Sequence, residues 1–107
     1  MNKINILGTT YEVSWESENE NHKLKTANGL CEIYSKRIVI NDDIQNDEDA
    51  FERFDLFENR VLRHEIVHAF LAESGLNDYA RDEELVDWIA MQYPKICKVF
   101  KQLGIEE

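Results

Sequence analysis

The chain has 107 residues, of which 43% are hydrophobic, and its 22 acidic and 12 basic side chains give a formal net charge of −10. This length is typical of one domain, so we expect residues 1–107 to form a single folded unit. The acidic balance argues against nucleic acid as a partner, because binding to a phosphate backbone needs clustered positive charge. The chain has neither an apolar run of membrane-spanning length nor the apolar stretch of a signal peptide. We therefore expect a cytoplasmic protein that does not bind membranes, with Cys31 and Cys97 as free thiols.

The N-terminal half, from Lys3 to Asn41, has the pattern of β-strands. Residues 4–7 and 11–15 predict a first hairpin that turns at Gly8-Thr9. Asn28-Gly29 is a turn signal.

The segments 30–34 and 37–41 after that turn predict a second hairpin. Three consecutive apolar residues, 38–40, are typical of a strand covered on both faces. We therefore predict an α+β fold, in which a small, mostly antiparallel sheet of three or four strands packs against helices from the C-terminal half. Strand 37–41 is a candidate for the edge of this sheet, where a peptide could add as a further strand.

From Asn46 onward the apolar residues recur with helical spacing. Residues 46–54 are acidic and predict a short helix or a loop. Asp55 and Glu58 fit a capping box, which predicts a helix from about Leu56 to Ser74 that stops at Gly75. Its expected sheet-facing residues are Leu62, Ile66, Ala69 and Phe70, and its expected solvent-facing residues are Arg60, Arg63 and Glu73.

A second helix is expected to begin at Asp82, which caps it, and to continue to about Tyr93. Pro94 should kink or restart the helix, because proline cannot donate to the preceding turn. Beyond it, a last helical stripe is expected up to Gly104, formed by Ile96, Val99, Phe100 and Leu103.

The expected first helix contains an H-E-x-x-H motif, His64-Glu65-Ile66-Val67-His68. Residues four apart lie on the same face of a helix, so His64 and His68 can present two imidazole nitrogens to one metal ion. Glu65, one position further round the helix, is placed to contact a water bound to that ion. These are two of the three histidines in the chain.

A catalytic zinc site usually has three protein ligands, so a third is needed. His22 lies in a polar segment far upstream and is not expected to bind metal. The acidic residues 82–84 at the start of the second helix are better candidates. Glu83 is favoured because Asp87, one turn further on, can accept the N–H of a ligating histidine and orient it. Glu84 has no such companion, but it remains the alternative ligand.

The motif on one helix, with a glutamate on the next and an Asp four residues later, resembles the gluzincin arrangement of thermolysin-like metallopeptidases. More closely, residues 64–70, preceded by a strand hairpin and followed by residues 83–90, resemble minimal ImmA/IrrE-type metallopeptidase domains, which phages and mobile elements often carry. The family often has Asn where this chain has Asp87, and Ala where it has Val86, which leaves the ligand register open by one residue.

The resemblance implies a Zn²⁺ cofactor, a protein or peptide substrate, and cleavage of regulatory proteins such as repressors. It implies that His64, His68 and Glu83 hold the ion and that Glu65 is the catalytic base. The candidates for an oxyanion donor are Tyr34, Tyr79, Arg81 and Tyr93. Two other hypotheses remain open: a metal-binding accessory protein without catalysis, and an acidic interaction protein that needs no metal. Two histidines and a carboxylate also suit other first-row divalent ions.

Overall fold

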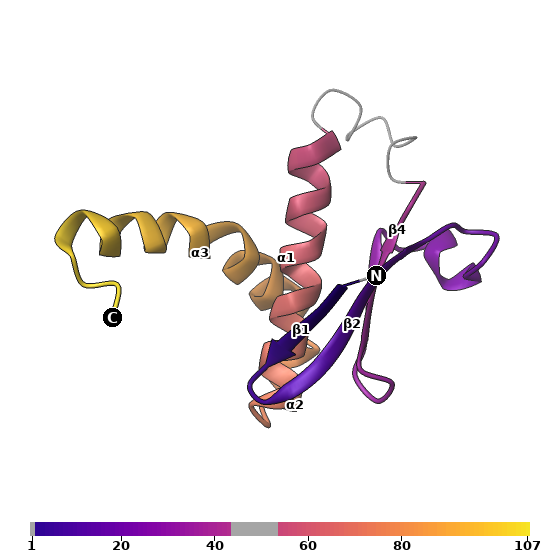
Figure 1. Ribbon diagram of the computed structural model, residues 1–107, viewed down its shortest axis with the longest axis horizontal. Coiled ribbons are helices and arrows are strands. Elements are labelled where there is room, and N and C mark those ends of the chain that lie inside the picture. Colours follow the sequence, from indigo (N-terminus) through magenta and orange to yellow (C-terminus); the bar gives the residue numbers. More distant parts are fainter. Residues whose placement is uncertain (1, 44–53) are drawn as a thin grey trace.

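A computed structural model describes residues 2–43 and 54–107 of the chain. The N-terminal half forms a four-stranded sheet and the C-terminal half forms helices, one of which packs on that sheet (Figure 1). The strands are β1 (Asn2–Ile6), β2 (Thr9–Glu16), β3 (Gly29–Glu32) and β4 (Arg37–Asn41), and a short 3-10 helix, η1 (His22–Lys25), lies between β2 and β3. The helices are α1 (Phe54–Glu73), α2 (Asn77–Ala80) and α3 (Glu83–Leu103). The predicted α+β class is confirmed.

The sheet is mixed, with the strand order β1-β2-β4-β3. The two antiparallel pairs, β1–β2 and β3–β4, are the two predicted hairpins. Gly29, predicted to lie in a turn, is instead the first residue of β3. They are joined by a parallel pairing of β2 with β4, in which Val13 lies opposite Ile38 and Trp15 opposite Ile40. The number of strands agrees with the prediction, but a mostly antiparallel sheet does not describe it fully. Hairpins follow from local turns, whereas the pairing between hairpins joins segments that are distant in sequence.

Strand β4 lies in the interior of the sheet, so the prediction that residues 37–41 form an edge is wrong. Its neighbours are β2 on one side and β3 on the other, which leaves no free backbone edge. Ile38, Val39 and Ile40 are all 0% exposed, which confirms that this strand is covered on both faces. The edge nearest the helices is β3, which contacts α1.

The core lies between one face of the sheet and α1. Apolar side chains from three strands meet Ala69 of α1 there, and partly buried residues of α1 surround them: the strand residues are Ile6, Tyr11, Val13, Ile38 and Ile40, and the helix residues are Phe57, Val61, Leu62 and Ile66. The prediction that Leu62, Ile66 and Ala69 face the sheet is confirmed. Phe70 is 42% exposed, because it lies one step of the helix beyond the stripe that contacts the sheet.

Helix α1 already includes Phe54 and Asp55, so Asp55 does not cap it as predicted. The hypothesis about residues 46–54 lies outside the described part of the chain except for Phe54. The predicted C-terminus is confirmed within a residue. Gly75 has φ +81°, and the backbone N–H of Leu76 donates to Leu71 O at 3.0 Å, which closes the helix with a glycine cap.

Helix α3 begins as predicted, since the Asp82 side chain accepts a hydrogen bond from the Leu85 backbone at 3.1 Å. The helix does not restart at Pro94, since α3 runs as one helix to Leu103. Proline deprives the Ala90 carbonyl of its intrahelical donor, but the Arg63 side chain donates to that oxygen through Nε at 3.2 Å. A contact from α1 therefore replaces the hydrogen bond that Pro94 cannot make. None of the helices in residues 2–43 and 54–107 combines the length and apolar character needed to cross a bilayer.

Glu73, predicted to face solvent, instead ties the end of α1 to the sheet. Its carboxylate accepts hydrogen bonds from Thr9 Oγ1 at 2.8 Å, Tyr11 OH at 2.7 Å and Lys36 Nζ at 2.8 Å. The hydrogen bond from Lys36, followed by those from Tyr11 and Thr9, lowers the pKa of Glu73 from its ordinary 4.5 to about 2. The prediction was wrong because the partners come from β2 and from the turn before β4, which are far away in sequence.

Glu73→Gln should therefore lower the melting temperature at neutral pH, and the difference from wild type should shrink in acid. A carboxylate whose pKa is depressed by folding stabilises the folded state above its unfolded pKa, and this contribution is lost as the pH falls from about 4.5 toward 2. Melting followed by circular dichroism at neutral pH and near pH 2 measures the difference, with Glu107→Gln at the exposed C-terminus as control. If Glu73→Gln lowers the melting temperature by the same amount at both pH values, the ionised Glu73 carboxylate does not stabilise the fold in this way.

Candidate metal centre

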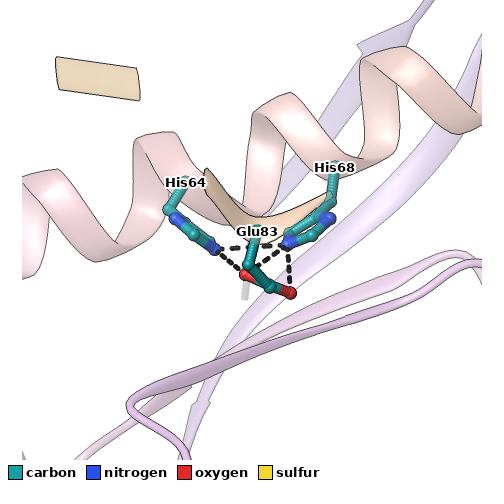
Figure 2. A group of neighbouring side chains, drawn as sticks. All are labelled: His64, His68 and Glu83. Carbon is teal, nitrogen blue, oxygen red and sulfur yellow. Dashed lines mark hydrogen bonds and ion pairs between the residues drawn. The ribbon is translucent and has the colours of Figure 1, made fainter. Parts of the chain in front are cut away.

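His64 and His68 project from the same side of α1 toward the N-terminus of α3 (Figure 2). Their ring centroids are 4.9 Å apart in an edge-on arrangement, and their two Nε2 atoms are separated by 3.2 Å. One helical turn places the two rings side by side, as the i, i+4 spacing predicts.

Glu83, the first residue of α3, brings a carboxylate to the two imidazoles. Its Oε2 lies 2.9 Å from His64 Nε2, and its Oε1 lies 3.1 Å from His68 Nε2. The turn after Gly75 and the short helix α2 reverse the chain, so that the Asp82 cap starts α3 beside α1. In a tetrahedral zinc site with ligands about 2.0–2.1 Å from the metal, ligand atoms lie about 3.3 Å apart. The three side chains therefore have the spacing of three corners of such a site.

Each histidine makes a hydrogen bond through Nδ1, which leaves Nε2 facing the other histidine and Glu83. His68 Nδ1 lies 2.5 Å from Ala80 O, and a carbonyl can only accept, so Nδ1 carries the hydrogen. His64 Nδ1 lies 3.3 Å from Asp87 Oδ1 and is a donor in the same way. In the neutral rings both Nε2 atoms are then lone-pair acceptors, directed at each other and at the Glu83 carboxylate. Three converging acceptors of this kind can hold a cation between them.

Asp87 lies where a second-layer partner of a ligating histidine is expected, one turn beyond Glu83 on α3. Its other oxygen, Oδ2, accepts a hydrogen bond from Arg60 Nη2 at 3.3 Å. Arg60, predicted to face solvent, therefore contacts the carboxylate that orients His64. A signal for this contact exists in the sequence, since Arg60 is four residues before His64 and so lies on the same face of α1.

Glu65 is almost fully buried, at 7% exposure, and its side chain borders a cleft of about 980 Å³ beside the two histidines. Burial raises the pKa of Glu65 above its ordinary value; the charge of Glu83 acts in the same direction, and the two histidines act against it. The edge strand β3 passes very close to Glu65. A Cβ on Gly29 would lie 2.8 Å from Val61 Cγ1 and 3.0 Å from Glu65 Cγ, so only glycine fits at this position.

The cleft runs between β3 with the segment before it, α1, and the start of α3. Three groups of residues form its walls: Asn28 to Cys31; Arg60, Val61, His64, Glu65 and His68; and Arg81, Glu83 and Asp87. Burial raises the pKa of Cys31 to about 12, so at neutral pH this residue is an inert thiol beside the site. Both cysteines are free, as predicted.

The other candidates from the sequence are placed differently. Glu84 is exposed and is not part of the His64, His68 and Glu83 group. His22 is exposed in η1 and also lies outside this group. Of the four candidate oxyanion donors, Arg81 lines the cleft. The tyrosines are more than half exposed and are not among its lining residues: Tyr34, Tyr79 and Tyr93.

Comparisons of the chain with models of known protein families, with curated proteins and with solved structures found no match.

Proposed function

We propose that the protein hydrolyses peptide bonds with a zinc ion held by His64, His68 and Glu83. The observation that carries this proposal is the convergence of three acceptor atoms, two imidazole Nε2 and one carboxylate, within hydrogen-bonding distance of one another. Two nitrogens and one carboxylate oxygen are a ligand set that suits Zn²⁺ and leaves a fourth position for water or substrate. The H-E-x-x-H pattern adds a buried carboxylate beside these ligands.

Bound zinc would supply a Lewis acid that lowers the pKa of water toward about 7 and polarises the scissile carbonyl. The Glu65 carboxylate accepts a proton from the attacking water and delivers it to the leaving amine. Asp87 fixes the orientation of His64, and Arg60 holds Asp87. Arg81 lines the cleft and is the candidate donor for the negative charge that develops on the carbonyl oxygen.

A peptide substrate can bind to the free edge of β3, in place of the edge expected at β4. The backbone N–H of Asn41 donates to Asn28 O at 2.9 Å, and these two residues lie opposite each other in the extended register of the β3–β4 pair. Hydrogen-bonded pairs alternate along antiparallel strands, so the backbone groups of Gly29 and Cys31 point away from β4. Both residues line the cleft, so an added strand would run past Glu65.

Metal content and chelator-sensitive hydrolysis test this function. We expect purified protein to bind a single zinc per chain with His64, His68 and Glu83 intact, and to cleave members of a fluorescence-quenched peptide library. Phenanthroline should stop cleavage and added zinc should restore it. Failure to bind zinc at stoichiometric concentration would refute the metal site. Tight zinc binding with no cleavage of any peptide would refute catalysis while leaving the metal site in place.

A further inference from the structure

Helix α3 extends well beyond the body that it packs against (Figure 1). Val86 and Ala90, in its first half, are buried at 0% and 1% exposure, and the helix contacts α1 and α2. After Ala90 no residue of α3 is buried. The C-terminal half nevertheless carries large apolar side chains, with Val99 at 52%, Phe100 at 39% and Leu103 at 69% exposure.

The apolar residues of α3 have the spacing of a helix that pairs with another helix. Alternating steps of four and three residues connect Leu85, Ile89, Gln92, Ile96, Val99 and Leu103. This is the a/d pattern of a heptad repeat, with Gln92 as its single polar member. Val86 and Ala90, which are buried against the domain, lie about a third of a turn from the middle of this stripe. Within the stripe Val99 and Leu103 are exposed, and the other four residues are partly buried.

We propose that this stripe pairs with the same stripe of a second copy of the chain, in an antiparallel helix dimer. When the two helices run in opposite directions with their free halves overlapping, Ile96 of each copy meets Val99 of the other, and Gln92 meets Leu103. Four layers result along about 18 Å of helix, counting residues 92–103 at 1.5 Å each. The two central layers pair Ile96 with Val99, and the two outer layers pair Gln92 with Leu103. Each position thus finds a partner of suitable size, as a two-fold interface requires.

The residues that flank the stripe favour this arrangement. In the antiparallel pair Tyr93 lies beside Phe100 of the second copy, and Lys95 lies beside Gln102, so no like charges meet across the interface. Lys98 and Lys101 lie on the opposite face of the helix and remain in water. Parallel pairing would bring two domains, each from a chain of net charge −10, to the same end of the helix pair, whereas antiparallel pairing places them at opposite ends. The proposal uses none of the metal ligands and is independent of the proposed function.

Sedimentation equilibrium from micromolar to submillimolar concentration tests the interface. We expect the weight-average mass of the full chain to rise to twice that of one chain. Val99→Glu and Leu103→Glu, combined, should hold it at the monomer value. Lys98→Glu with Lys101→Glu, which adds more negative charge on the far face, should leave the dimer intact. A wild-type monomer over this range would overturn the proposal, as would a dimer that survives Val99→Glu and Leu103→Glu. A wild-type monomer whose α3 binds vesicles of anionic lipid would overturn it in favour of a membrane surface.

Disulfide trapping tests the orientation. In a Cys97→Ser background, oxidation of a mixture of Gln92→Cys and Leu103→Cys chains should give a cross-linked heterodimer. Either chain oxidised alone should give little cross-linked dimer, because residue 92 of one copy does not lie beside residue 92 of the other, and the same holds for residue 103. Efficient cross-linking of each chain alone would overturn the antiparallel arrangement. Circular dichroism, and zinc binding to His64, His68 and Glu83, check that the variants remain folded.

Discussion

Glu65→Gln should leave zinc bound and reduce peptide hydrolysis about 100- to 10,000-fold, the usual contribution of a general base. The amide has nearly the shape of the carboxylate, but it cannot accept a proton from water. Because Glu65 is 7% exposed, the substitution also removes a buried charge, so we do not expect the melting temperature to fall. Single-turnover hydrolysis of a quenched peptide, with zinc content measured on the same sample, gives both quantities.

The outcome separates an enzyme from a metal-binding accessory protein. If the wild type cleaves peptides and Glu65→Gln cleaves them equally well, Glu65 is not the base and the mechanism is wrong. If the variant loses zinc as well as activity, Glu65 supports the metal site instead of acting on water. Glu58→Gln is a matched control, because Glu58 is on the same helix but contacts the Trp15 indole N–H at 2.7 Å and does not line the cleft.

Glu83→Ala should weaken zinc binding by more than about 100-fold, because loss of a ligand should exceed the 10- to 100-fold cost of losing a second-layer partner. Glu84→Ala should bind zinc like the wild type. Both residues lie in the first turn of α3, so each substitution removes one negative charge from the same helix N-terminus and costs the helix a similar amount of stability. Only Glu83 has oxygens at 2.9 Å and 3.1 Å from the two histidines.

Competition titration against a chromophoric zinc chelator measures the two affinities. The comparison isolates ligation, since charge, helix position and exposed surroundings are shared by the pair. Loss of zinc in Glu84→Ala with retention in Glu83→Ala would shift the ligand register by one residue. If both variants bind zinc as tightly as the wild type, neither Glu83 nor Glu84 is a ligand, and the histidines are the protein ligands that remain.

Short-range features of the chain were predictable because each depends on residues close together in sequence. The two hairpins follow from pairs of neighbouring apolar segments, the end of α1 follows from Gly75, and the cap of α3 follows from Asp82. The side-by-side position of His64 and His68 is likewise a property of one helical turn. Even the preference for Glu83 over Glu84 used only the i, i+4 relation to Asp87.

Contacts between distant segments were decided by the tertiary structure alone. The parallel pairing of β2 with β4 makes the expected edge strand an interior one and leaves β3 as the wall of the cleft. Glu73 meets Thr9, Tyr11 and Lys36 only because the sheet returns to the end of α1.

The continuity of α3 through Pro94 also depends on a contact between distant segments. Local sequence predicts a kink or a restart there, because proline lacks the N–H that the helix needs. Arg63, on another helix, supplies the donor for the Ala90 carbonyl, and the helix continues. Local rules hold where a residue's hydrogen-bonding partners lie within a turn or two along the chain. Where a polar group finds its partner across the fold, as Ala90 and Glu73 do, the partner's identity depends on chain packing that no short window of sequence contains.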